Sequence, residues 1–432
     1  DVLTGGASAT YGADAVAGVV NFITRKMDGV EIRAGWSGYR HDNDNGYIQP
    51  LLDARGFDYP TGTEGPDGEN HQIDFIMGSD FADGKGNATI YGTWREQKEL
   101  RQEARDYSAG ALTGSATGVG GSANAIVPNY FLAPTVVGGQ GPAGTNGRAY
   151  DYGQEFFGNL TPEGGLKGWD GTNRYNYAPV NHFLRPIEQW SVGAFAEYEL
   201  NEHFTPYFET MFASNTSRAQ IAESGTFFAE AYILDLDDFP APFQAALIDL
   251  YGSEYDEYGV YVGKRNVEGG PRSDNTSHDS FRIVTGLKGD INDTWSYDVS
   301  YLYANTRSTS TYVNDFFAPN ITKNIDPDTA DILYDVFTYQ GVTPEQANAL
   351  TGVGILNGNS STEVINGFVT GDLFALPTAS DPIKVVVGYE WREETFERLS
   401  DTVFEEGQLL GQGGPTPSLI GSYNVTEFFG EA

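Results

Sequence analysis

The sequence predicts an all-β protein built on an antiparallel transmembrane β-barrel. Three observations predict this fold class. Apolar and polar residues alternate with a period of two along about ten segments, the gaps between these segments alternate between short and long, and Trp or Tyr stands at segment ends. The 54 glycines, 26 tyrosines and 26 phenylalanines among 432 residues fit the same class.

The composition excludes several other classes. The net charge of −35 argues against a nucleic-acid-binding protein, because phosphates would be repelled and no basic stripe offsets the 60 acidic residues. The absence of cysteine excludes disulfides, thiolate metal sites and cysteine nucleophiles. No run approaches the ~18 apolar residues of a transmembrane helix. A transmembrane β-strand carries no such run, since its lipid-facing and lumen-facing residues alternate.

Period-two alternation begins after Lys26 and predicts the strands in order. Val30 and Ile32, for example, alternate with Glu31 and Arg33. We expect strands near 29–39, 71–81, 87–95, 188–200, 204–213, 280–289, 295–310, 363–374, 383–398 and 423–432. In the strand at 383–398, the apolar residues are predicted to face lipid and the charged residues to face the lumen or a plug. The apolar set is Val385, Val387 and Tyr389, and the charged set is Lys384, Glu390 and Arg392.

The gaps predict hairpins that open onto two different sides. Short gaps resemble the periplasmic turns of an outer-membrane barrel, and long gaps resemble its extracellular loops. The long gaps cover roughly 40–70, 96–187, 214–279, 311–362 and 399–422. Helix signals occur inside them at 243–251, 328–337 and 344–350.

A soluble sandwich, propeller or β-solenoid gives the same alternation, because one face of its sheets lies on a core and the other in water. Two features favour the membrane barrel. Aromatic residues stand at strand ends, as in interfacial girdles, and the opposite face is charged even at mid-strand. The aromatic residues are Trp36, Trp94, Trp190, Tyr198, Trp295 and Trp391, and the charged ones are Glu197, Glu209, Asp298 and Glu390.

Residues 2–12 and 18–24 closely resemble the end of the plug domain of TonB-dependent outer-membrane receptors. The matching positions are Gly5, Ser8, Tyr11, Gly12, Gly18, Val19, Val20, Asn21 and Thr24, while Ala7 and Phe22 depart mildly. The resemblance implies a plug inside a barrel of about 22 strands. Residues 1–26 would be the C-terminal part of the plug domain, and 27–432 the N-terminal part of the barrel. We therefore expect an internal fragment, with the TonB box, plug start and later strands outside it.

The resemblance also implies a function without covalent chemistry. Such a receptor lies in the Gram-negative outer membrane, binds a scarce solute on its extracellular loops and imports it when TonB rearranges the plug. The solute would be an oligosaccharide, a ferric chelate or a cobalamin-type ligand, and the partners would be TonB, outer-membrane lipid and the solute. No catalytic, metal or cofactor site is expected. The alternatives are a passive outer-membrane porin and a secreted acidic β-rich enzyme or adhesin.

The 96–187 gap is the candidate ligand-contact loop, because it is the longest and its aromatic side chains can stack on a ligand face. These residues are Tyr150, Tyr152, Phe156, Phe157, Trp169, Tyr175 and Tyr177. The alternative is that they pack the loop's own small core, or that the loop is a spacer.

The acidic stretches 42–46 and 235–238 offer oxygen ligands for Ca²⁺ but lack a spaced bidentate Glu, which favours solvated acidic loops.

Overall fold

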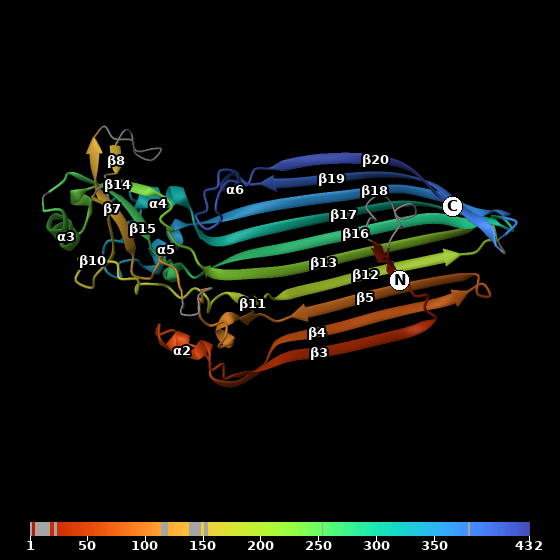
Figure 1. Ribbon diagram of the computed structural model, residues 1–432, viewed down its shortest axis with the longest axis horizontal. Helices are drawn as coiled ribbons and strands as arrows, with labels where there is room; N and C mark the ends of the chain where they lie inside the picture. Colours follow the sequence, from red (N-terminus) through yellow and green to blue (C-terminus); the bar gives the residue numbers. More distant parts are fainter. Residues whose placement is uncertain are drawn as a thin grey trace.

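The computed structural model describes residues 2–4, 18–20, 24–113, 120–137, 148–150, 154–252, 254–378 and 381–432. Its main element is a ten-stranded antiparallel sheet in the order β20-β19-β18-β17-β16-β13-β12-β5-β4-β3 (Figure 1). These strands are β3 (Gly29–Asn43), β4 (Gly62–Phe81), β5 (Gly86–Gln97), β12 (Ile187–Tyr198), β13 (Thr205–Glu223), β16 (Pro271–Asn292), β17 (Trp295–Phe316), β18 (Thr351–Ala375), β19 (Pro382–Ser400) and β20 (Leu419–Glu431). The predicted all-β, antiparallel architecture is confirmed.

All ten predicted strands are present, and several continue further toward the long connections than the alternation indicated. β18 begins at Thr351 rather than near 363, and β13 continues to Glu223 rather than ending near 213. These extensions are rich in Gly, Asn, Ser and Thr, so they carry no apolar alternation. They are strands because their backbones pair with equally long neighbours, for example Thr309 with Asn357.

The large sheet has one apolar face. Residues directly opposite each other in an antiparallel pair project to the same face, so the register can be followed from strand to strand. It places one large apolar residue of each strand on a common face: Ile32, Phe75, Ile90, Val192, Phe212, Ile283, Tyr301, Ile365, Val387 and Phe428. Much of this face is uncovered, with 68% of Ile32, 58% of Val387 and 82% of Phe428 exposed.

The opposite face is polar. It carries all four mid-strand acids named above, and each has a partner on another strand of the sheet. The Glu390 carboxylate accepts from the Asn366 amide at 3.0 Å. Arg282 pairs with Glu209 at 3.0 Å, Lys288 with Glu197 at 3.1 Å, and the Tyr207 hydroxyl donates to Asp298 at 2.7 Å. In β19 the predicted apolar set and the predicted charged set lie on opposite faces, as alternation requires. That the apolar face contacts lipid remains a prediction.

One glycine on the polar face shows how closely neighbouring strands pack. Gly388 of β19 is paired with Phe429 of β20. A Cβ atom added at Gly388 would lie 2.1 Å from the Phe429 ring, so the ring occupies the space that any other residue would need. Aromatic rings that cover cross-strand glycines in this way help to fix strand register.

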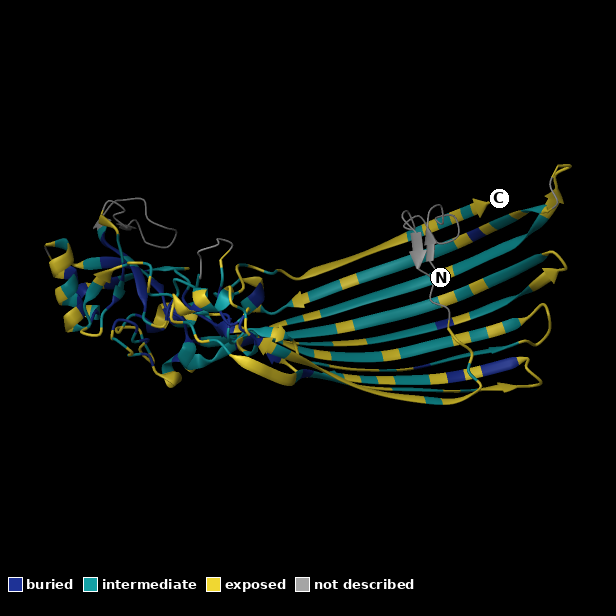
Figure 2. Ribbon diagram, turned by 60° about the horizontal axis from the view of Figure 1, so that its bottom comes forward, coloured by how far each residue is buried: buried dark blue, intermediate teal, exposed yellow. Residues whose placement is uncertain are grey.

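Three of the long connections fold into a second unit, which we call the loop subdomain (the described residues of 120–186, 224–270 and 317–350). It contains an antiparallel sheet in the order β10-β9-β7-β15-β14, with β8 paired to β7. The strands are β7 (Asn129–Val137), β8 (Arg148–Tyr150), β9 (Phe156–Leu160), β10 (Leu166–Gly168), β14 (Ala231–Asp235) and β15 (Glu257–Gly263). Figure 2 shows that buried residues concentrate here, whereas the large sheet is mostly exposed or intermediate.

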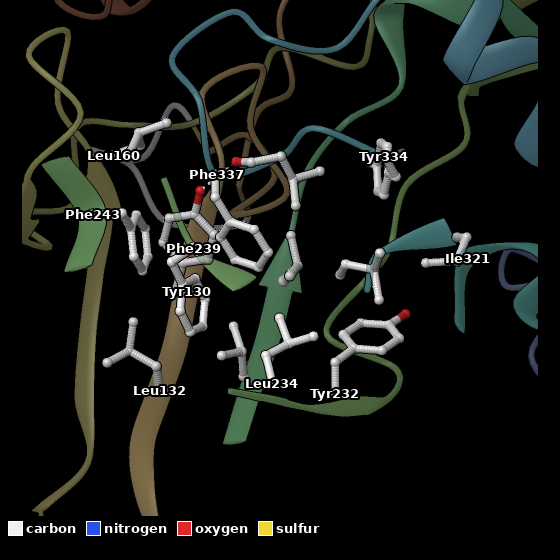
Figure 3. Packing of buried hydrophobic residues seen from close by; sticks show 14 of the residues in the cluster. Tyr130, Leu132, Leu160, Tyr232, Leu234, Phe239, Phe243, Ile321, Tyr334 and Phe337 are labelled. Atoms are coloured by element: carbon white, nitrogen blue, oxygen red, sulfur yellow. Dashed lines mark hydrogen bonds between the residues drawn. The ribbon is translucent and has the colours of Figure 1, made fainter. Parts of the chain in front are cut away.

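The core of the loop subdomain joins segments far apart in sequence. The rings of Tyr130, Phe239, Phe243 and Phe337 pack together (Figure 3), with Tyr130 stacked on Phe337 at 5.8 Å between centroids. The Tyr130 hydroxyl donates to the carbonyl of Val336 at 2.6 Å. A loop region with such a core is an ordered scaffold rather than a set of independent loops.

The helices agree with the sequence in two places and differ in one. α3 (Ala241–Tyr251) and α5 (Pro344–Leu350) confirm two predicted helices. The helix predicted at 328–337 is wrong, because the chain forms α4 (Ala318–Asn324) instead. The Asn324 side chain accepts hydrogen bonds from the backbone N–H groups of Asp331 and Ile332, which holds the following segment in an irregular course.

Smaller elements complete the described structure. α2 (Ile48–Asp53) and α6 (Thr402–Glu405) lie in two other long connections. β6 (Leu100–Arg101) pairs with β11 (His182–Leu184), and β1 (Val2–Thr4) pairs with β2 (Gly18–Val20). None of the helices in the described ranges is both long and apolar enough to cross a bilayer.

Candidate functional site

The segment 24–27 lies against the polar face of the large sheet. Of the residues predicted to form the plug motif, Gly18 begins β2 and is paired with Thr4 of β1. Thr24 lines a cavity of about 390 Å³ together with polar-face residues of β5, β12, β13, β16 and β17. The remaining predicted plug residues, Gly5, Ser8, Tyr11, Gly12 and Asn21, lie outside the described residues.

Ion pairs and backbone hydrogen bonds fasten this segment to the sheet. The Glu197 carboxylate pairs with Lys26 through one oxygen and with Lys288 through the other. The Met27 N–H donates to the Thr89 hydroxyl at 3.3 Å, and its carbonyl accepts from the Asn87 amide at 2.9 Å. Side chains of β5 and β12 therefore hold residues 26 and 27, and Lys288 of β16 supports the segment indirectly through Glu197.

A glycine allows the close approach. A Cβ atom added at Gly78 of β4 would lie 2.4 Å from the carbonyl oxygen of Met27, which is far inside van der Waals contact. Gly78→Ala is therefore expected to displace the segment and to increase hydrogen exchange at the Met27 amide at least tenfold in the full-length protein. Gly35→Ala is the matched control, because its Cβ would lie on the same face with only Gln72 at 3.9 Å. Equal hydrogen exchange at the Met27 amide in both variants would contradict this close contact between Gly78 and Met27.

Two residues of the predicted ligand-contact loop meet in an aromatic cluster. Phe157 stacks on Phe131 with 4.1 Å between centroids, and Trp169 contacts Phe157 edge-on at 4.6 Å. Phe228 closes the cluster, with its ring 5.2 Å from that of Phe131. The four rings are half-buried, so the cluster combines mutual packing with an accessible surface. We call Phe131, Phe157, Trp169 and Phe228 the aromatic quartet.

Trp169 also offers unused hydrogen-bonding capacity. The guanidinium of Arg174 lies 4.8 Å from its ring centroid, which is a cation–π distance. Its indole N–H is buried without an acceptor among the described residues. A buried N–H without an acceptor is costly, so a ligand or water oxygen that accepted from it would be stabilised here.

Tyr175 and Tyr177 lie beside a buried arginine instead of in the quartet. The Arg265 guanidinium lies 5.2 Å from the ring of Tyr175 and 5.2 Å from the ring of Phe227. Burial and the neighbouring Arg272 lower the pKa of Arg265 to about 10, so it stays charged at neutral pH. The Tyr175 hydroxyl donates to the Glu223 carboxylate, and burial together with this carboxylate raises the pKa of Tyr175. The Tyr175 hydroxyl is thus held in a buried hydrogen bond, whereas 38% of the surface of Tyr177 is exposed.

Phe227 and Phe228 join these two groups of side chains. Both have left-handed backbone conformations, with φ of 51° and 52°, which is strained for residues other than glycine. Phe227 contacts the arginine, and Phe228 is itself a member of the quartet. The sequence analysis missed both residues, as well as β15. Tyr258, Val260 and Val262 recur at every second position, and this period was the signal that would have found that strand.

The other predicted loop residues contribute less. Phe156 lies in β9 and packs against the core of the loop subdomain. Tyr150 ends β8, and its side chain and Tyr152 lie outside the described residues. The structure therefore brings Phe157 and Trp169 together, and places Tyr175 and Tyr177 at a neighbouring arginine. Whether any of them contacts a ligand remains a prediction.

A buried polar junction connects the large sheet to the long connections. The Asp315 carboxylate is fully buried at the end of β17. It accepts hydrogen bonds from the Ser224 hydroxyl and from the N–H groups of Phe316 and Gly411, both at 3.0 Å. Arg272 donates to the carbonyl of Ala222 at 2.9 Å in the same region. Burial raises the pKa of Asp315, while Ser224 and Arg272 oppose the shift.

Three carboxylates from two separate segments can hold a hard cation. Oxygens of Asp238, Asp326 and Asp328 all lie within 4.8 Å of one another. Burial raises the pKa of Asp238, and the two neighbouring carboxylates raise it further. Oxygen ligands of this kind suit Ca²⁺. Only one of the three comes from the acidic stretch 235–238, because the others are brought in by the fold.

No family model matches the chain, and no curated protein matches it. Among solved structures, the chain is similar to the open form of the ferric-catecholate import receptor Fiu from E. coli K12, with 11% sequence identity and a TM-score of 0.41. The match covers 99% of this chain and 56% of that receptor chain. The chain thus spans little more than half of that receptor chain's length.

Proposed function

We propose that this chain is the plug end and the first barrel strands of an outer-membrane receptor. Such a receptor would bind a scarce solute on its loop subdomain and import it by TonB-coupled movement of the plug. The observation that carries the proposal is the single apolar face, which all ten strands of the large sheet share and which is left uncovered. Exposed apolar surfaces of this extent mark a contact with a membrane or with another protein.

The dimensions of this face favour a membrane. On β12 the apolar positions run from Trp190 to Tyr198, about the 9–11 residues with which a tilted strand crosses a bilayer. Aromatic residues stand at both limits of the face, and all six that the sequence singled out project from it. Such a distribution is energetically favourable in a bilayer, since Trp and Tyr prefer the interface between hydrocarbon and water.

The two ends of the sheet support the direction of transport. The compact turns lie at one end and the loop subdomain at the other (Figure 1). Residues 26 and 27, which follow the segment that resembles the end of a plug, are held on the polar face by Glu197, Asn87 and Thr89. Ion pairs with a side chain as exposed as Lys26 are weak, so a pulling partner can release this segment at modest cost.

The proposal is tested with the full-length protein in cells with and without TonB. The protein should fractionate with the outer membrane, and uptake of nanomolar solute should cease without TonB or after collapse of the proton gradient. A ferric catecholate and a linear oligosaccharide are the first two solutes to compare. TonB-independent uptake would favour a passive porin, and recovery in the soluble periplasm would favour a secreted enzyme or adhesin.

The candidate contact loop is tested best by a point substitution. A deletion of 108–180 would also remove β7, which carries the core residues Tyr130 and Leu132, and the loop subdomain would collapse. Tyr177→Ala removes an exposed ring without opening the core. We expect it to weaken solute binding roughly two- to tenfold, the value of one aromatic contact of about 0.5–1.5 kcal/mol. The comparison is made by equilibrium binding to purified receptor.

Tyr47→Ala is the control for that experiment. Tyr47 precedes α2, is 62% exposed, and belongs to a different long connection. Its loss should leave solute affinity unchanged. If both variants bind as tightly as the wild type, the 96–187 connection acts as a spacer at this position rather than as a contact surface.

A further inference from the structure

A groove of about 660 Å³ lies on the same face of the large sheet as the apolar residues, next to their limit on the loop-subdomain side. One row of paired residues crosses it from strand to strand: Glu96, Glu188, Thr216, Ser277 and Thr309, contributed by β5, β12, β13, β16 and β17. The next row toward the compact turns begins with Trp94 and Trp190, which are also directly paired. The groove therefore meets the apolar face at these two tryptophans, whereas the same row continues over β13, β16 and β17 through Ser214, Asp279 and Arg307.

The lining of the groove suits sugar hydroxyls. Thr216, Asn275, Ser277, Thr309 and Thr311 form a wall of hydroxyl and amide groups. Such groups donate and accept, as the hydroxyls of a sugar do. Three carboxylates and two cations also line the groove. Lys98 pairs with Glu96, and Arg218 pairs with Glu99 at 2.8 Å. With Glu188 in addition, the groove has an excess of negative charge, which disfavours a headgroup with many phosphates.

The tryptophan at the edge of the groove connects the two regions. The Trp94 indole N–H points to the Glu188 carboxylate, with 3.4 Å between nitrogen and oxygen. This contact holds the ring where the apolar residues end and the polar row begins. Trp at such a boundary sits at the level of lipid headgroups in membrane proteins. An acyl chain lying along Val192 would place its headgroup in the groove.

We propose that this groove binds the sugar headgroup of a glycolipid in the outer leaflet around the protein. The proposal rests on the proposed function, because it needs the apolar face to lie in a membrane with the loop subdomain outside. The hydroxyl and amide wall recognises the sugar, and the apolar face recognises the acyl chains. A free saccharide would use only the first of these contacts and would bind more weakly.

The test uses the full-length protein in phosphatidylcholine nanodiscs that contain either monoglucosyl diacylglycerol or phosphatidylglycerol as a minor lipid. Native mass spectrometry of the released protein measures which lipids remain bound. We expect at least fivefold enrichment of the glucosyl lipid over its share of the disc, and no enrichment of phosphatidylglycerol. The double variant Thr216→Leu, Asn275→Leu should abolish the enrichment. Asn215→Leu, next to Thr216 but on the polar face, is the control and should retain it.

Three results would overturn the glycolipid site. These are equal enrichment of phosphatidylglycerol, full enrichment in the double variant, and displacement of the glucosyl lipid by millimolar free glucose. The failure of this inference can be distinguished from the failure of the proposed function. A protein that inserts into nanodiscs without enriching the glucosyl lipid overturns only the groove assignment, whereas one that does not insert at all overturns the membrane assignment as well.

Discussion

Replacing Asp315 by alanine is expected to destabilise the loop end of the large sheet by about 3–5 kcal/mol, the usual cost of removing one partner from a buried charged network. The substitution leaves the Ser224 hydroxyl and the Gly411 N–H without their acceptor and removes the carboxylate that compensates Arg272. Hydrogen exchange at the Phe316 and Gly411 amides of the full-length protein measures the effect. Exchange should become at least a hundredfold faster, since about 1.4 kcal/mol corresponds to a factor of ten.

The control for this substitution is Asp274→Ala. Asp274 lies on the neighbouring strand β16, is only half-buried, and accepts a hydrogen bond from the Ser310 hydroxyl at 2.5 Å. Its removal should cost about 1 kcal/mol, the net value of one ordinary hydrogen bond. Similar exchange rates in both variants would show that Asp315 does not fasten this junction.

Asp315 also predicts a pH dependence. Burial raises the pKa of its carboxyl group, so the folded protein binds this proton more tightly than the unfolded chain does. Stability at the loop end should therefore fall as the pH rises from the ordinary pKa of an aspartate to the raised pKa of Asp315. Asp315→Asn removes the titration, and the exchange rates of wild type and variant should converge below this window and separate above it. Parallel pH profiles would contradict the raised pKa.

Val387→Arg is expected to destabilise the full-length protein by about 2–4 kcal/mol, the cost of an arginine near the middle of the bilayer on the lipid face of a barrel. Val387 lies on the apolar face of β19 and is 58% exposed in the isolated chain. Leu250→Arg is the control, because Leu250 is an apolar residue of α3 that is 38% exposed but belongs to the loop subdomain. It should change stability by less than about 0.5 kcal/mol.

The measurement is guanidinium unfolding of the protein from lipid vesicles. Gly388→Arg, one residue away on the polar face, provides an independent comparison. Its side chain would displace the Phe429 ring rather than enter lipid, so its effect should not depend on bilayer thickness. If Val387→Arg and Leu250→Arg have equal effects, the apolar face does not lie in a membrane.

Much of the large sheet was predictable because strand alternation is a local signal. The residues of β19 divide between two faces by their spacing alone, and the same holds for the other nine strands. The short and long gaps also followed from local composition, since Gly, Asn and Pro interrupt the alternation. The limits of the strands were less predictable. The first part of β18 is extended because β17 pairs with it, and its own sequence resembles a loop.

The antiparallel strands, their two faces and the short and long connections thus follow from residue types at neighbouring positions. The packing of the long connections depends on contacts between distant residues. The tertiary structure joined Phe228 to Phe157 and Asp238 to Asp326, and it placed Ser224 against Asp315. Those contacts link residues that lie 71 to 91 positions apart in the chain. No periodic pattern relates such residues, so the packing of one against another becomes apparent only when the whole chain is folded.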